Sequence, residues 1–185
     1  YWPADEGSGT AVSDAAGNFA GTLSAGDWTA DGGGHTGISG DAAFLLTGED
    51  GGASVVEVPT LGQVFTEITI SGWIRGSQTG DWSGIFQSRD GSQPIGLGYR
   101  AGSGELAYTW NDNNAETYNF ASSLVIPVDE RAFVALTLTP ESATLYLGAN
   151  GELNSATNAI PHIEQSSLET PWHFGKDNCC GTERN

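Results

Sequence analysis

Residues 66–75 read TEITISGWIR, the clearest alternating stretch in the chain. In an extended segment Ile68, Ile70 and Ile74 fall on one face, whereas Trp73 and the polar residues fall on the other. A period of two with β-branched residues on one side is typical of a strand that buries one face. The isoleucines are therefore expected to face a hydrophobic core, with Trp73 packing on the opposite side of the strand.

The same reasoning predicts strands on both sides of this stretch. Residues 131–139 alternate similarly, and Pro140-Glu141-Ser142 turns the chain into residues 143–147 to form a hairpin. No apolar stripe with helical spacing persists, so no substantial helix is expected. Further short strands are expected at residues 42–47, 54–58, 82–88, 94–100, 105–110, 118–126 and 171–175. This pattern predicts an all-β fold, a two-sheet antiparallel β-sandwich of the jelly-roll type.

Length and composition agree with one such domain. The chain has 185 residues, enough for a single domain over 1–185 with a sizeable core. It contains 27 glycines, no methionine and 16% charged residues, which fits short strands and turns better than a helical bundle.

The charge balance excludes several classes of partner. Six Lys and Arg face 23 Asp and Glu, giving a formal net charge of −17. Such a chain repels phosphate backbones and anionic lipids, so no nucleic acid is expected as a partner. No run approaches the ~20 apolar residues of a spanning helix, so no membrane insertion is expected either. The acidity and low lysine content indicate an extracellular protein, secreted or at the cell surface.

Several phrases along the chain occur in the order known from one family. They are YWPADEGSGT at 1–10, GTL at 21–23, AFLLTG at 43–48, VEVP at 56–59, FTEITISGWI at 65–74, FVALT at 133–137, LYL at 145–147 and NGEL at 150–153. Together they resemble the laminin-G-like, concanavalin A-like sandwich domains, to which the pentraxins are related. The resemblance implies a concanavalin A-like sandwich and a carbohydrate ligand.

One departure from that family concerns the chain end. The family closes with a strand that pairs beside the N-terminal one, and this strand would come just after Asn185. Two expectations follow: either the chain continues past Asn185, or the sheet has an open edge that pairs with a second copy or another chain.

The acidic residues do not predict catalysis. A retaining glycosidase needs two carboxyl groups about 5–5.5 Å apart, and on one strand this requires even spacing. No two of the 23 acidic residues are spaced i, i+2, and the i, i+4 pairs Asp27/Asp31 and Asp112/Glu116 fall in turn-rich sequence. His35, His162 and His173 show no metal-type or triad-type clustering. The chain is therefore expected not to be an enzyme.

Calcium is the one metal that the loops favour, because they offer hard oxygen ligands. By resemblance, a structural ion would be held by Asp5, Gly48 and Asp50, with a last ligand from the missing strand. The pentraxin comparison implies a second site at Arg89-Asp90-Gly91 and Lys176-Asp177-Asn178, with Asp90, Asp177 and Asn178 as ligands. The alternative for these loops is Asp/Asn turn chemistry, which needs no ion.

Loop-edge aromatic residues and a cysteine pair complete the candidate site. Trp82 and Trp110 stand at strand ends, where they either stack on a sugar ring or cap a sheet. The chain has two cysteines, Cys179 and Cys180, and they are adjacent in sequence. In an oxidising compartment this predicts a disulfide between them, and the resulting ring would line the ligand site. The alternatives are two reduced thiols or an intermolecular bridge. The expected ligand-binding residues are Trp82, Arg89, Asp90, Trp110, Asp177, Asn178, Cys179 and Cys180.

These observations favour a non-catalytic module that binds a glycan or polysaccharide, with calcium as its candidate cofactor. One rival is a structural or adhesive subunit that assembles through the open edge and binds no sugar. The other is a polysaccharide hydrolase or lyase.

Overall fold

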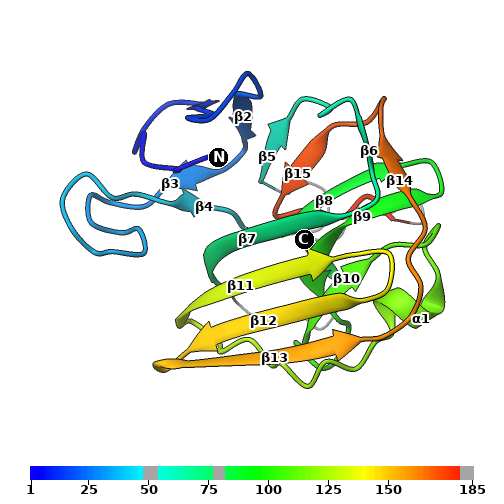
Figure 1. Cartoon of the computed structure of the whole chain (residues 1–185). Coiled ribbons are helices and arrows are strands. Elements are labelled where there is room, and N and C mark those ends of the chain that lie inside the picture. Colours follow the sequence, from blue (N-terminus) through cyan, green and yellow to red (C-terminus); the bar gives the residue numbers. More distant parts are fainter. Residues whose placement is uncertain (48–53, 77–81, 180–185) are drawn as a thin grey trace.

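The computed structural model describes residues 1–47, 54–76 and 82–179 (Figure 1). Its elements are, in chain order, β1 (Ala11–Val12), β2 (Gly21–Ser24), β3 (Asp27–Trp28), β4 (Phe44–Leu45), β5 (Val55–Val58), β6 (Gln63–Phe65), β7 (Ile68–Arg75), β8 (Ser83–Asp90), β9 (Gln93–Tyr99), β10 (Leu106–Thr109), α1 (Ala115–Tyr118), β11 (Arg131–Leu138), β12 (Ala143–Ala149), β13 (Glu152–Asn158), β14 (Gln165–Ser167) and β15 (Trp172–Phe174).

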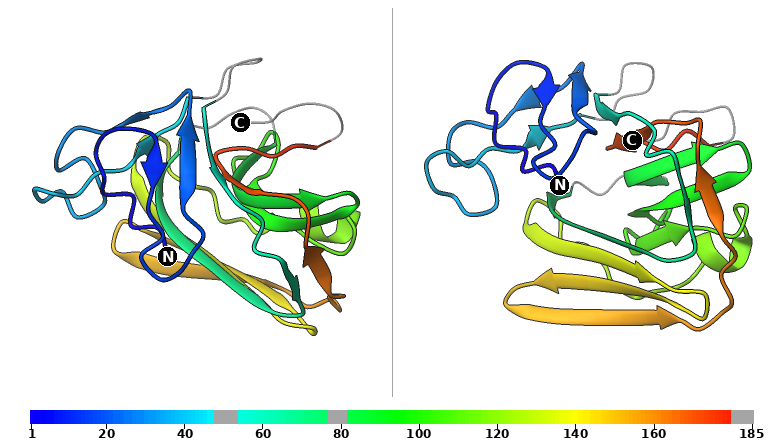
Figure 2. Two further views of the ribbon diagram at one scale, coloured as in Figure 1. Left: turned by 90° about the horizontal axis from the view of Figure 1, so that it is seen from above. Right: turned by 45° about the horizontal axis from the view of Figure 1, so that its top comes forward.

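Two antiparallel sheets form the sandwich. The larger has seven strands in the order β1-β2-β5-β15-β8-β9-β10, and the smaller has four in the order β13-β12-β11-β7. Two short ribbons, β14-β6 and β3-β4, flank them. In Figure 2, β8 to β10 (green) lie on one side and β11 to β13 (yellow to orange) on the other, with the N-terminal strands at one end. The predicted antiparallel β-sandwich is confirmed.

The core lies between the two sheets. Each sheet contributes the apolar residues of its inner face. The four-stranded sheet supplies Ile70, Val134, Leu136, Leu138, Leu145 and Leu147, and the seven-stranded sheet supplies Val56, Val58, Phe86, Ile95, Leu97, Leu106, Tyr108 and Trp172. Because successive residues of a strand face opposite sides, the other face of β8 to β10 remains available for a site.

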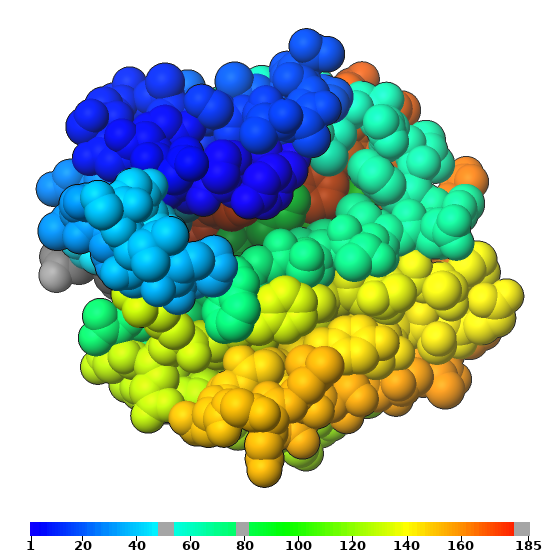
Figure 3. Space-filling model, turned by 60° about the vertical axis from the view of Figure 1, so that its left-hand side comes forward, coloured from blue at the N-terminus to red at the C-terminus, as the bar shows by residue number. Residues whose placement is uncertain are grey.

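Strand β7 behaves as its alternation predicts. Ile70 is buried, whereas Trp73 is 54% exposed on the outer face. Trp73 packs there between His35, stacked at 5.1 Å between ring centroids, and Phe133 at 5.7 Å. Figure 3 shows this side of the molecule, where β11 to β13 (yellow to orange) form a continuous surface beside the N-terminal segment (blue).

The predicted strand at 118–126 is wrong. Residues 115–118 form α1, because the Asn114 side chain accepts the backbone N–H of Glu116 and thereby caps the helix start. After α1 the segment that leads to β11 forms two isolated β-bridges, Glu105 to Val125 and Gly76 to Val128, but no strand. The segment predicted at 42–47 shortens to β4, and the expectation of no substantial helix is confirmed, since α1 has four residues.

The edge strands of the two sheets bear on the expected assembly through an open edge. β1 is an edge of the seven-stranded sheet but has two residues, whereas β7 is an eight-residue edge of the four-stranded sheet in the described part of the chain. Assembly through an edge stays a prediction.

Among the described residues, no helix has the length and apolar character needed to cross a membrane.

Candidate functional site

A row of three paired residues forms the floor of the site. Gln87 of β8 pairs with Gly96 of β9, which pairs in turn with Thr109 of β10. Directly paired residues of neighbouring strands share a face, and the neighbours of these three (Phe86, Ile95, Leu97 and Tyr108) belong to the core. The row Gln87–Gly96–Thr109 therefore lies on the outer face of the seven-stranded sheet.

Glycines in β9 let the Gln87 side chain lie flat across this floor. A Cβ on Gly96 would stand 2.8 Å from Gln87 Cα and closer still to its Cγ, and a Cβ on Gly98 would stand 2.8 Å from Gln87 Nε2. Contacts under 3.0 Å are essentially never seen for real Cβ atoms, so a larger residue at Gly96 would require Gln87 to move. At Gly98 a Cβ would in addition overlap the backbone carbonyl of Ser83. The Gln87 side chain consequently occupies the space over these two glycines, on the side of the sheet that faces the site.

An ion pair forms one wall of the site. Arg89 Nε and Nη2 donate to Asp177 Oδ1 at 3.0 and 2.8 Å, and Nη2 also donates to Oδ2 at 3.0 Å. The side chains of Arg89 and Asp177 are 11% and 7% exposed. Asp177 follows β15 and reaches Arg89 because Gly84 has no side chain; a Cβ there would overlap the Lys176 carbonyl and stand 2.9 Å from Asp177 N. The pair is thus buried and held from two elements.

The loop after β10 contributes Asn113. Three successive non-glycine residues, Asn111, Asp112 and Asn113, have φ angles of 50°, 53° and 61°, a region that Asn and Asp enter at the lowest cost. Asn111 anchors the turn, since its Nδ2 donates to Pro161 O at 2.9 Å and its Oδ1 accepts from Ile163 N. The turn places Asn113 Oδ1 3.3 Å from Arg89 Nη1, which donates to it.

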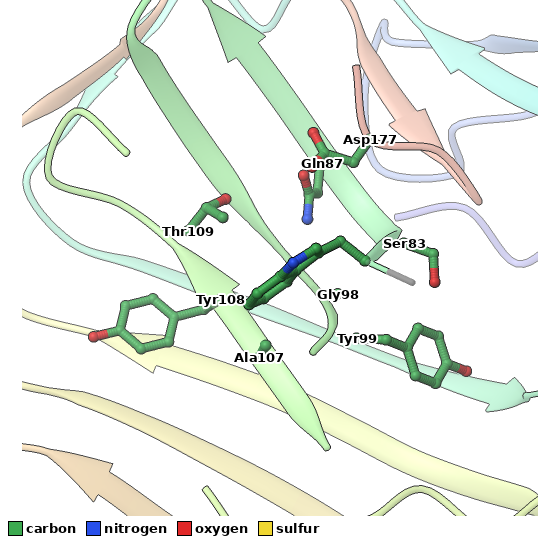
Figure 4. Close-up of a pocket in the computed structure, with 9 residues that line it drawn as sticks. Ser83, Gln87, Gly98, Tyr99, Ala107, Tyr108, Thr109 and Asp177 are labelled. Atoms are coloured by element: carbon green, nitrogen blue, oxygen red, sulfur yellow. The ribbon is translucent and has the colours of Figure 1, made fainter. Parts of the chain in front are cut away.

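Two aromatic rings stand at the mouth. The rings of Trp82 and Tyr118 meet edge to face, with centroids 5.6 Å apart and planes at 89°. They enclose a cavity of about 230 Å³, here called the Trp82 pocket, lined by Trp82, Arg89, Thr109, Asn113, Tyr118, Asp177 and Cys179. Next to it lies a second space of about 10 Å³, the inner chamber, which shares Trp82, Thr109 and Asp177 with the pocket (Figure 4). The other residues that line the chamber are Ser83, Gln87, Gly98, Tyr99, Ala107 and Tyr108.

Among the described residues that line the Trp82 pocket, the positive and negative charges balance. Its cation, Arg89, and its carboxylate, Asp177, neutralise each other at hydrogen-bond distance. Both oxygens of Asp177 are occupied by Arg89, so a calcium ion at this carboxylate has to compete with the guanidinium. Within the described ranges no group of three or more His, Cys, Asp and Glu could hold a metal ion. The set predicted from the pentraxins also includes the Asn178 amide, and a calcium ion at this loop stays a prediction.

The structure brings half of the predicted ligand residues together. Trp82, Arg89, Asp177 and Cys179 line the same pocket. Asp90, half-buried at the end of β8, and the exposed Asn178 do not line it. Trp110 does not fit the predicted role, because its ring is fully buried and its Nε1 donates to Ile163 O. Asp5 is exposed in the N-terminal segment.

Some predicted residues lie outside the described part of the chain. Gly48 and Asp50, which were predicted for the rim calcium site, lie outside the described residues, and so does Cys180. Cys179 is 6% exposed and carries no free thiol. The Cys179–Cys180 ring is not tested and stays a prediction.

Three residues that line the Trp82 pocket were not predicted, namely Thr109, Asn113 and Tyr118. Gln87 of the inner chamber was not predicted either. Two signals for them are visible in the sequence. The Gly96-Leu97-Gly98 alternation empties one face of β9, and the Asn111–Asn114 run allows a left-handed turn. Neither signal identifies which strands pair with β9. That pairing decides which side chains lie next to Gly96 and Gly98.

Comparison with known proteins agrees with this architecture. Residues 50–185 match the family described as the concanavalin A-like lectin/glucanases superfamily. No curated protein matches the chain. One similar solved structure is domain 4 of AbnA, a GH43 extracellular arabinanase from Geobacillus stearothermophilus, in complex with arabinotriose; it is 16% identical with a TM-score of 0.48, over 88% of this chain and 85% of that one. The family match spans well over half of the sequence, and the chain belongs to the concanavalin A-like lectin/glucanase superfamily.

Proposed function

We propose that this domain is a non-catalytic carbohydrate-binding module of a secreted or cell-surface protein, and that the Trp82 pocket is its binding site. The observation that carries the proposal is the perpendicular Trp82–Tyr118 pair at the mouth of a pocket whose wall carries the polar side chains of Arg89 and Asn113. Membership of a superfamily of lectins and glucanases supports a sugar as ligand.

The chemistry of the pocket suits a sugar ring. Sugars present an apolar face of C–H groups and an equatorial edge of hydroxyls, and aromatic rings with nearby hydrogen-bonding groups match both. Four of the five guanidinium N–H groups of Arg89 are bound to Asp177 and Asn113, and the remaining one can donate to a hydroxyl. Because the pocket is electrically neutral and the chain carries a net charge of −17, neutral glycans fit better than polyanions.

The absence of catalysis is part of the proposal. Hydrolysis of a glycosidic bond requires two carboxyl groups in defined roles. Among the described residues that line the Trp82 pocket, Asp177 is the single carboxylate, and Arg89 holds both of its oxygens. This supports recognition rather than turnover.

The test compares substitutions of two tryptophans, one in the pocket and one on the other sheet. Trp82→Ala removes a ring from the pocket, whereas Trp73→Ala removes an exposed ring from the other sheet. Calorimetry and affinity electrophoresis against arabinan, xylan, mannan, galactan and mixed-linkage β-glucan should show binding by the wild type and a loss of about tenfold or more in Trp82→Ala. Trp73→Ala should bind as the wild type does.

Two results would contradict the proposal. If Trp73→Ala abolishes binding and Trp82→Ala leaves it intact, the site lies on the other sheet. If reducing-sugar or unsaturated-product assays show turnover that a Trp82 pocket variant abolishes, the domain is an enzyme.

A further inference from the structure

We infer that the inner chamber is a subsite for a single oxygen atom, occupied by water in the free protein and by one sugar hydroxyl in the complex, with Gln87 and Thr109 as its hydrogen-bonding partners. This inference rests on the proposed function of the Trp82 pocket. It names the two residues that set which hydroxyl of a sugar is recognised.

The first observation is a pair of polar atoms without partners. Gln87 and Thr109 are 5% and 7% exposed. Neither Gln87 Oε1 nor Thr109 Oγ1 has a hydrogen-bond partner among the described residues. An unpaired buried polar group costs about as much as a lost hydrogen bond, so such atoms generally bind water or a ligand.

The second observation is where these atoms lie. Both residues line the inner chamber, and both pair with the same glycine, Gly96. In Figure 4, Gln87, Thr109 and Asp177 surround one space, whereas the hydroxyls of Tyr99 and Tyr108 point away from it. The Tyr108 hydroxyl is already bonded to His162 Nε2 and Asn158 Nδ2 at 3.0 and 2.8 Å. Of the described polar side chains that line the chamber, Gln87 and Thr109 are those with a buried atom that has no hydrogen-bond partner.

The third observation is size. The chamber offers about 10 Å³ to the centre of a water-sized atom, close to the roughly 10–15 Å³ that one buried water requires. It is too small for a sugar ring. Because Trp82, Thr109 and Asp177 line both spaces, an oxygen in the chamber would lie next to a ring held in the Trp82 pocket.

A subsite of this kind discriminates strongly. A site built around a hydroxyl rejects an analogue that lacks it, because buried polar groups then lose their partner. One hydroxyl of the bound sugar should accordingly matter far more than the others. Stacking on Trp82 and Tyr118 does not distinguish hydroxyl positions so sharply.

The experiment uses Thr109→Val, which removes the hydroxyl and keeps the shape, with Thr69→Val on the outer face of the other sheet as matched control. Saturation-transfer NMR is performed with D-glucose, D-galactose, L-arabinose and their monodeoxy derivatives. In the wild type, removing one particular hydroxyl should weaken binding about tenfold, and in Thr109→Val the same removal should have no further effect. Thr69→Val should retain the wild-type discrimination.

A crystal structure of the sugar-free protein provides a readout that needs no ligand. We expect an ordered water within hydrogen-bond distance of Gln87 Oε1 and Thr109 Oγ1, and its loss in Thr109→Val. A dry chamber in the wild type overturns the inference. So does a Thr109→Val variant that discriminates deoxy sugars as well as the wild type, and in that case the proposed function stands. If Trp82→Ala binds every sugar as tightly as the wild type, the proposed function fails and the inference with it.

Discussion

Arg89 and Asp177 are the residues that give the pocket its wall. Their buried ion pair joins β8 to the segment after β15, 88 positions apart in the sequence. Removal of one partner of a buried pair leaves an uncompensated charge, which costs about 3–5 kcal/mol. Arg89→Met should therefore lower the free energy of unfolding by roughly that amount, as measured by urea denaturation.

The double variant Arg89→Met, Asp177→Leu provides the control. It removes both charges and should recover more than half of the lost stability, because no charge is then left unpaired. Equal stability of Arg89→Met and the wild type would show that the pair is not buried in solution.

His162 predicts a pH dependence. It is 6% exposed, its Nε2 contacts the Tyr108 hydroxyl, and burial lowers the pKa of its imidazole below the usual value of about 6.5. As the pH falls through about 6.5 the unfolded chain binds this proton before the folded one, so acid destabilises the fold. His162→Gln should reduce the loss of unfolding free energy between pH 7 and 5, whereas the exposed His35→Gln should not. Identical pH slopes for the wild type and His162→Gln would contradict this assignment.

Strand β9 contributes to the site because Gly96 has no side chain and so leaves room for Gln87. A Cβ on Gly96 would press against Gln87 Cγ and Cα, whereas a Cβ on Gly72 of β7 has nothing within 4 Å, and neither glycine has a positive φ. Gly96→Ala should destabilise the domain by about 1–3 kcal/mol in thermal melts and weaken sugar binding, because Gln87 must leave the floor. Gly72→Ala should be neutral or stabilise slightly. Equal effects of the two substitutions would show that the floor adapts freely.

Strands with one buried face were the predictable ones. β7, β11 and β12 alternate clearly because one side of each meets the core. β13 was not predicted, since it is an exposed edge strand whose polar sequence ELNSATN has no hydrophobic period. At residues 118–126 the apolar residues resembled a strand, but the Asn114 cap and the left-handed turn before it determine the local backbone.

The site shows a similar limit. Loop-edge position and the pentraxin resemblance indicated Trp82, Arg89 and Asp177 correctly as neighbours. They also favoured Trp110 over Thr109, but the strand alternation turns Tyr108 and Trp110 inward and Thr109 outward. Aromatic character alone does not show on which face of the sheet a side chain lies. The register of β8 to β10 depends on contacts between residues distant in sequence, so it could not be predicted from the sequence.

The whole molecule combines an uncharged pocket with a strongly acidic chain. Its net charge of −17 attracts cations of every kind, so any added salt relieves self-repulsion. Calcium binding, which we retain as a proposal, must therefore be distinguished from this general effect. The candidate ligands are Asp5 on the rim and Asp90 beside the Arg89–Asp177 pair.

Thermal melts at matched ionic strength make that distinction. An ion that binds the folded state alone stabilises it by RT ln(1 + [L]/Kd), about 2.7 kcal/mol at a hundredfold excess over Kd. If calcium binds at a site with oxygen ligands, saturating calcium should raise the melting temperature above that in magnesium or in chelator with sodium chloride, and Asp5→Asn or Asp90→Asn should abolish the difference. Identical curves in all three buffers would remove calcium from the proposal. Zinc held by Cys179 would contradict it outright, because a thiolate ligand indicates a softer metal than calcium.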